Sequence, residues 1–115
     1  MGECGAAWIP FVLGRMDHRY MDGGYNGKFD PPLTVLASEY WYRQGSTTFQ
    51  EEPYAGHIVD LIGETNVIWG SDYPHLDGVW PDSGEIILQT LGSLEPKVLK
   101  NITCANAVNR YRMGH

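Results

Sequence analysis

The sequence contains no long hydrophobic run. A membrane-spanning helix needs roughly eighteen consecutive apolar residues, and no segment approaches that length. No charged segment followed by an apolar one precedes a cleavage site, so a secretory leader is not indicated either. A membrane protein is therefore not expected, and the chain is predicted to be cytoplasmic.

Cysteine is also scarce in this chain. The two cysteines, Cys4 and Cys104, lie far apart, and neither has a second cysteine nearby. This spacing excludes both a CxxC redox pair and a zinc knuckle. Two free thiols are expected.

Basic residues are outnumbered by acidic ones. The chain has 8 Lys and Arg against 14 Asp and Glu, which gives a formal net charge of -6. Its densest basic cluster is Arg110-Tyr111-Arg112. Nucleic acid and anionic membranes are therefore not expected as partners, and a small molecule remains the expected ligand.

Short apolar stretches alternate with helical patterns along the 115 residues. That alternation predicts an α/β fold with parallel strands and helices outside them. The predicted elements are, in order, a strand or loop at 2–10, a helix at 11–20, an extended loop at 21–37, a strand at 47–49, a helix ending near Gly63, a strand at 66–71, a helix begun by an Asp82–Glu85 capping box, and helical pieces at 98–102 and 105–111.

The segment WGSDYPHLDGVW at 69–80 carries an acid just behind the strand predicted at 66–71. Ligands of parallel sheets bind beyond the carboxyl ends of the strands, in open sheets and in barrels alike. Asp72 is therefore the first candidate for a functional site.

Several motifs occur in a fixed order: GAAWIP, RMDH, SEY, TF, WGSDYPHLDGVWP and the Asn-Ala of 106–107. Together they resemble the C-terminal part of the amidohydrolase-related family, in the branch of the aminocarboxymuconate-semialdehyde decarboxylase-like enzymes. The resemblance covers nearly the whole chain. It implies that residues 1–115 form about strands six to eight, with their helices, of a TIM (β/α)8 barrel.

The resemblance also implies an activity and a cofactor. Enzymes of this family bind a divalent metal, usually zinc, and hydrolyse or non-oxidatively decarboxylate small carbonyl or carboxylate compounds. Asp72 matches the metal ligand after strand eight, whereas the HxH pair after strand one and the histidine after strand five have no counterpart here. We therefore expect a partial barrel from a truncated reading frame, inactive alone, in which Asp72 is both the metal ligand and the catalytic group.

Three further residues are candidates for the substrate pocket, and two of them, His75 and Arg43, also have a structural alternative. His75 either orients Asp72 or is a loop histidine without a catalytic role. Glu3 lies where some relatives carry a catalytic histidine, which leaves the general acid or base undefined. Arg43 either binds a substrate carboxylate or forms a helical ion pair with Glu39.

A second function from another class is also compatible with the sequence. The chain would then be a non-catalytic α/β interaction module that pairs with another chain through exposed strand edges. Formation of a homo-oligomer is left open by the sequence.

Overall fold

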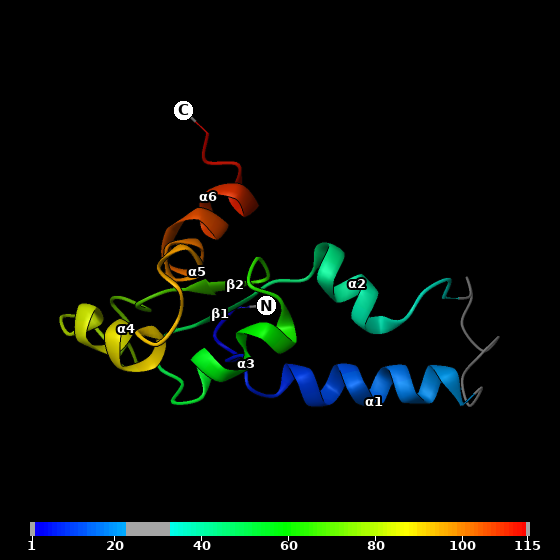
Figure 1. The fold of residues 1–115 in the computed structure, drawn as a ribbon. Coiled ribbons are helices and arrows are strands. Elements are labelled where there is room, and N and C mark those ends of the chain that lie inside the picture. Colours follow the sequence, from blue (N-terminus) through cyan, green and yellow to red (C-terminus); the bar gives the residue numbers. More distant parts are fainter. Residues whose placement is uncertain (1, 23–32, 115) are drawn as a thin grey trace.

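The computed structural model describes residues 2–22 and 33–114, and Figure 1 shows their arrangement. Much of the loop predicted at 21–37 lies outside the described residues. The described elements are α1 (Ile9–Met21), α2 (Ala37–Gln44), β1 (Thr47–Phe49), α3 (Ala55–Ile62), β2 (Val67–Trp69), α4 (Ser83–Leu91), α5 (Pro96–Lys100), the π-helical turn η1 (Asn101–Ala105) and α6 (Asn106–Tyr111).

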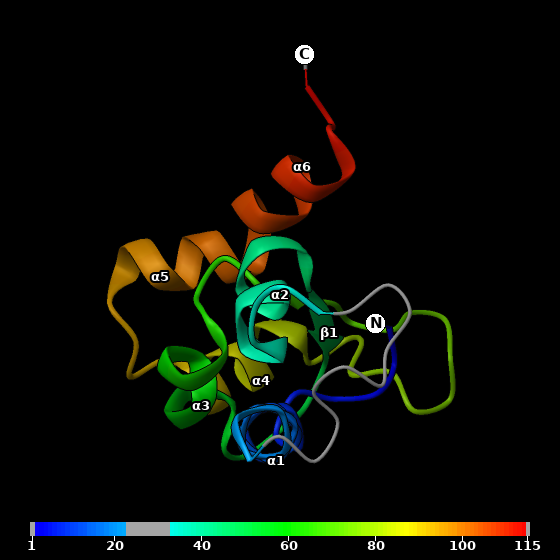
Figure 2. The same cartoon turned by 90° about the vertical axis from the view of Figure 1, so that its right-hand side faces the viewer.

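The two strands pair in parallel, with Thr47 opposite Val67 and Phe49 opposite Trp69. Alternate residues of a strand point to opposite faces of the sheet. Phe49 and Val67 are fully buried on the face that packs against the helices, in one cluster with α3, α4 and η1 residues such as Val59, Leu91 and Ile102. Figure 2 shows α3, α4 and α5 on this side of β1. The observed architecture is therefore a small α/β unit with one helix-covered sheet face.

The strand considered at 2–10 is not formed. Glu3 has φ 57° and Gly5 has φ 65°, both in the left-handed region, which is incompatible with an extended strand. The small residues of this segment form a loop that leads into α1 instead. The described sheet therefore has two strands, whereas the barrel resemblance predicted three.

The strand predicted at 66–71 is shorter than expected. It ends at Trp69, because the chain then turns away and Asp72 adopts φ 56°. The amide of Gly70 still donates to the carbonyl of Phe49 at 3.0 Å, so the last ladder bond lies just beyond the strand. Asp72 thus follows the end of β2 by three residues rather than directly.

Helices α1, α3, α4 and α6 lie where helices were predicted, whereas α2 was not among the predicted elements and the predicted cap of α4 is not formed. Pro10 lies in the first turn of α1, as expected from its fixed φ. The Asp82–Glu85 capping box is not formed, because the Asp82 side chain makes no capping hydrogen bond and Glu85 accepts one from Gln89 at 2.9 Å. No helix of the described residues has the length and apolar character needed to cross a bilayer.

Asn66 joins the start of β2 to the end of α2. It is 5% exposed, and its side-chain amide donates to three main-chain oxygens at 2.8–3.2 Å, those of Trp41, Tyr42 and Gly45. The last carbonyls of a helix have no partner within the helix. Asn66 therefore completes the C-terminal end of α2 from a distant part of the chain.

Asn106 makes the corresponding connection on the other side of β2. This side chain is also 5% exposed, and its amide donates to the carbonyls of Glu64 at 2.6 Å and Val67 at 2.7 Å. Together the two buried asparagines fix β2, and with it the loop that follows, between α2 and α6.

Candidate functional site

The loop at 70–80, which carries Asp72, closes on itself. The amide of Val79 donates to the carbonyl of Ser71 at 3.0 Å, and the amide of His75 donates to the carbonyl of Asp72 at 2.8 Å. A left-handed backbone is tolerated by aspartate better than by most residues. These bonds hold Asp72 in that conformation, with its side chain 21% exposed.

Gly78 allows the loop to close tightly. A Cβ atom there would lie 2.9 Å from the carbonyl oxygens of Ser71, Asp72 and His75. Real Cβ atoms rarely approach other atoms so closely, so a larger residue would open the loop around Asp72. The sequence analysis did not single out Gly78, although the Asp77-Gly78 pair is a recognised turn signal.

His75 is the nearest polar partner of Asp72. Its Nδ1 lies 3.3 Å from Oδ2 of Asp72 and also 3.4 Å from the amide nitrogen of Asp77. One imidazole nitrogen cannot donate to the carboxylate and accept from the amide at the same time. The ring therefore has two alternative hydrogen-bonding states, both with long contacts, and its side chain is 68% exposed.

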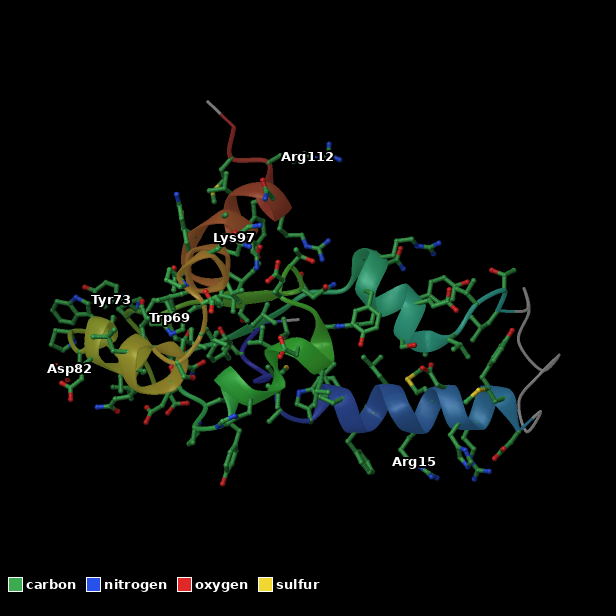
Figure 3. The ribbon with its side chains drawn as sticks, in the orientation of Figure 1. Arg15, Trp69, Tyr73, Asp82, Lys97 and Arg112 are labelled. Atoms are coloured by element: carbon green, nitrogen blue, oxygen red, sulfur yellow. The ribbon has the colours of Figure 1, made fainter. Side chains whose placement is uncertain are left out.

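Two aromatic side chains of the loop contact each other. Tyr73 and Trp80 meet edge to face, with ring centroids 5.2 Å apart and an interplanar angle of 62°. The ring of Trp80 therefore packs against Tyr73 within the loop. Figure 3 shows Tyr73 and Trp69 at the end of the molecule occupied by α4.

Glu3 lies on the loop before α1 and is exposed. Its amide donates to Oγ1 of Thr48 at 3.2 Å, which places it beside the middle of β1. Figure 2 shows the N-terminal segment and the loop at 70–80 on the same side of the sheet, opposite α3 and α4. The segment that carries Glu3 and the loop that carries Asp72 therefore lie on the same side of the sheet, although they are separate loops.

Arg43 occupies a different region. It lies near the end of α2, which leads into the start of β1, whereas Asp72 follows the end of β2. Its guanidinium lies 5.0 Å from the centre of the Tyr40 ring, and no ion pair with Glu39 is formed. Hydrogen bonding to Thr34 is the main cause that lowers the pKa of Tyr40, and the charge of Arg43 adds to it. The structure does not bring Arg43 together with Asp72.

A divalent metal would need more ligands than these residues supply. Among residues 2–22 and 33–114, no three His, Cys, Asp or Glu side chains converge in a way that could hold an ion. A catalytic zinc site ordinarily has three protein ligands. The described residues therefore do not form a metal site by themselves, and Asp72 with His75 provides two donors at most.

Two grooves lie in another part of the described chain. The smaller, of about 350 Å³, runs beside α1 and is lined by Phe11, Val12, Arg15, Met16, Arg19, Tyr20, Leu33 and Ala37. The second lies between α1, α2 and the end of α6. Neither groove is lined by Asp72, His75 or Glu3.

The fold, the loop after β2 and the motif order together place the chain in an enzyme family. The sequence pattern of the family described as Amidohydrolase matches residues 1–113, and the chain belongs to this family. No curated protein matches the chain.

One solved structure similar to the chain is 5-carboxyvanillate decarboxylase LigW from Sphingomonas paucimobilis. The similarity has a TM-score of 0.69 at 22% sequence identity, and it covers 91% of this chain and 31% of the decarboxylase. At this identity the likeness shows a shared fold. The chain thus spans about a third of the length of that structure.

Proposed function

We propose that this chain is the C-terminal part of a metal-dependent amidohydrolase-type barrel enzyme. The complete enzyme would hydrolyse or non-oxidatively decarboxylate a small carbonyl or carboxylate compound. The observation that carries the proposal is the position of Asp72, on a closed loop beyond the carboxyl end of β2. Ligand-binding groups of such barrels lie at this end of the strands.

Within the barrel, we assign β1 and β2 to strands seven and eight. Their parallel pairing, the helices on one face of the sheet and the 31% coverage of the decarboxylase support this assignment. Strand six would then end at about Glu3, because the described residues after Glu3 form a loop and lead into α1. The sequence predicted a strand or loop at 2–10, and the described residues form the loop there.

The roles follow from these positions. Asp72 would be one metal ligand, and His75 would orient it through Nδ1, while the metal, with zinc as the expected ion, takes its other ligands from earlier strands. Glu3 would face the same pocket from the end of strand six. Arg43 lies near the start of β1, so its proposed contact with a substrate carboxylate is the least supported of these roles. We also retain a cytoplasmic location as part of the proposal.

The test is an activity assay of the complete protein with added zinc or manganese. The substrate panel would contain aromatic carboxylates, 5-carboxyvanillate among them, and small amides and lactones. Carbon dioxide release or hydrolysis that disappears with a chelator and returns with metal is the expected result. Turnover of these substrates that is insensitive to chelation and to Asp72→Ala would contradict the proposal.

One observation favours the alternative function as an interaction module. Among the described residues β2 pairs with β1 alone, so its other edge has no strand partner, although the Asn106 side chain already binds the carbonyl of Val67 on that edge. An open strand edge can pair with a second chain. A complete protein that binds no divalent metal, yet holds a partner through β2, would support this function over catalysis.

A further inference from the structure

The loop before α1 is held by a distant carboxylate. Oε2 of Glu52 accepts from the amide of Ala6 at 2.8 Å, and Oε1 accepts from the amides of Ala6 at 3.0 Å and Ala7 at 3.2 Å. Hydrogen bonds to an ionised acceptor are stronger than neutral ones. Glu52 lies in the turn between β1 and α3, so this contact joins segments 46 positions apart.

Gly5 is required for this contact in two ways. Its φ of 65° lies in the left-handed region, and a Cβ atom at this position would lie 2.5 Å from Oε1 of Glu52. A side chain there would both strain the backbone and displace the carboxylate. The contact between Glu52 and the loop therefore depends on glycine at position 5.

Two threonines of β1 hold the same loop on either side of Gly5. Oγ1 of Thr47 donates to the carbonyl of Gly5 at 2.9 Å, and the amide of Glu3 donates to Oγ1 of Thr48 at 3.2 Å. Neighbouring strand residues point to opposite faces of a sheet. The loop therefore passes around the outer edge of β1, from the face that carries Glu3 to the face that packs against the helices, where Ala6 is buried.

We infer that Glu52 is a positioning residue, whose carboxylate holds the loop at 3–7 so that Glu3 stays on the same sheet face as the loop of Asp72. The role of Glu3 in a catalytic site rests on the proposed function. The hydrogen bonds from the loop to Glu52 do not depend on the proposed function. Because the carboxylate of Glu52 occupies the free amides ahead of α1, these amides are not available to an external anion.

The loop at 3–7 contains a cysteine whose reactivity can be measured. Cys4 is exposed, and in a Cys104→Ser background it is the single thiol of the chain. We would measure hydrogen exchange of the Ala6 and Ala7 amides, together with the alkylation rate of Cys4 followed in its own peptide by mass spectrometry, in the complete protein. Exchange of the α1 amides serves as the internal reference for global opening.

Glu52→Ala should speed exchange of the Ala6 and Ala7 amides about ten-fold relative to α1 and raise the alkylation rate of Cys4. Glu52→Gln, which keeps a neutral acceptor, should restore part of the protection. Added formate should protect the amides again in Glu52→Ala, because a free carboxylate fits the space left by the missing one. Glu51→Ala, at the exposed neighbouring position, is the matched control and should leave both rates unchanged.

Unchanged exchange at Ala6 and Ala7 in both Glu52 variants, or equal acceleration in Glu51→Ala, would overturn the inference. If Glu52→Ala unfolds, the Glu52→Gln measurement decides, because it must still expose these amides more than those of α1. The result is independent of catalysis. Activity of the complete enzyme that is insensitive to Glu3→Gln would remove Glu3 from the proposed site and leave the hold by Glu52 intact.

Discussion

The carboxylate of Asp72 lies 3.3 Å from Nδ1 of His75, three residues later in the same closed loop. Both side chains therefore move with one loop, whose ends are tied by the bond between Val79 and Ser71. The remaining polar groups of a metal site have to come from other strands. The chain alone therefore offers two donors from one loop, whereas a complete barrel would add metal ligands from other strands.

Alone, the chain should show no metal-dependent hydrolase or decarboxylase turnover. Asp72 and His75 give at most two ligands, one fewer than the three that a catalytic zinc site ordinarily has. The check is an assay of the purified chain with zinc, manganese or chelator, beside Asp72→Ala. Metal-dependent turnover that Asp72→Ala abolishes would show that the described chain completes a site by itself.

In the complete protein, Asp72→Ala should lower metal occupancy and activity together. Asp77→Ala should leave the metal content nearly unchanged, since Asp77 is exposed at the far end of the loop. Both changes remove one carboxylate from the same loop, so each controls for the loss of charge. Metal analysis after dialysis gives the answer, and equal metal loss in the two variants would show that the loop does not distinguish them.

In the complete protein, Asn106→Ala should lower the free energy of unfolding much more than Asn109→Ala, although both residues lie in α6. The change at 106 leaves the buried carbonyl of Val67 and the partly buried carbonyl of Glu64 without their partner, at a cost of about 2 kcal/mol. Asn109 is exposed, so its replacement should cost little. Denaturant melts of the two variants test this, and equal midpoints would mean that Asn106 does not hold β2.

The position of Asp72 could be predicted because its signals are local. The apolar residues before it predict a strand, and the residues at 72–80 follow in a recognisable motif. The residues that fix its loop were missed, because a bond such as that between Val79 and Ser71 depends on how the chain turns. The sequence indicates a turn at Asp77-Gly78, but it does not indicate which carbonyls the turn brings together.

The choice between the strand and the loop predicted at 2–10 could not be made from the sequence for a related reason. A run of small residues is compatible with a strand or a loop, and the choice depends on Glu52, a distant partner in sequence. In the loop, its carboxylate binds the amides of Ala6 and Ala7, and Glu3 and Gly5 have left-handed conformations. The sequence shows that Glu52 and the segment at 2–10 are both present, but it does not show that they lie close together in the fold.

The position of Arg43 relative to the sheet likewise could not be predicted without knowing how α2 meets its strand. Its helical position beside Glu39 was evident from a spacing of four, but the ion pair that this spacing allows is not made. Arg43 contacts Tyr40 instead, near the start of β1. Spacing along a helix shows which residues share a face of that helix. It does not show which end of the sheet they approach, because that depends on the direction in which the helix meets its strand.

The last prediction concerns the chain in isolation, which should be oligomeric, aggregated or loosely packed. Its radius of gyration is 16.0 Å, whereas a closed domain of this length has about 13 Å. The edge of β2 has no strand partner among the described residues, and large apolar side chains such as Phe11 and Leu76 are exposed. Net stability of a domain is only about 5–15 kcal/mol, and each large apolar side chain left exposed forfeits about 1.5–3 kcal/mol of burial.

Circular dichroism does not test this prediction, because the helices can form without a closed core. Size-exclusion chromatography with light scattering, followed by a denaturant melt, does. The matched control is the same segment joined to the barrel strands that the proposed function places before it, which should run as a defined species and unfold cooperatively. A monodisperse monomer of the chain with one cooperative transition would contradict the prediction, since the described elements would then close a core without the strand that β2 lacks.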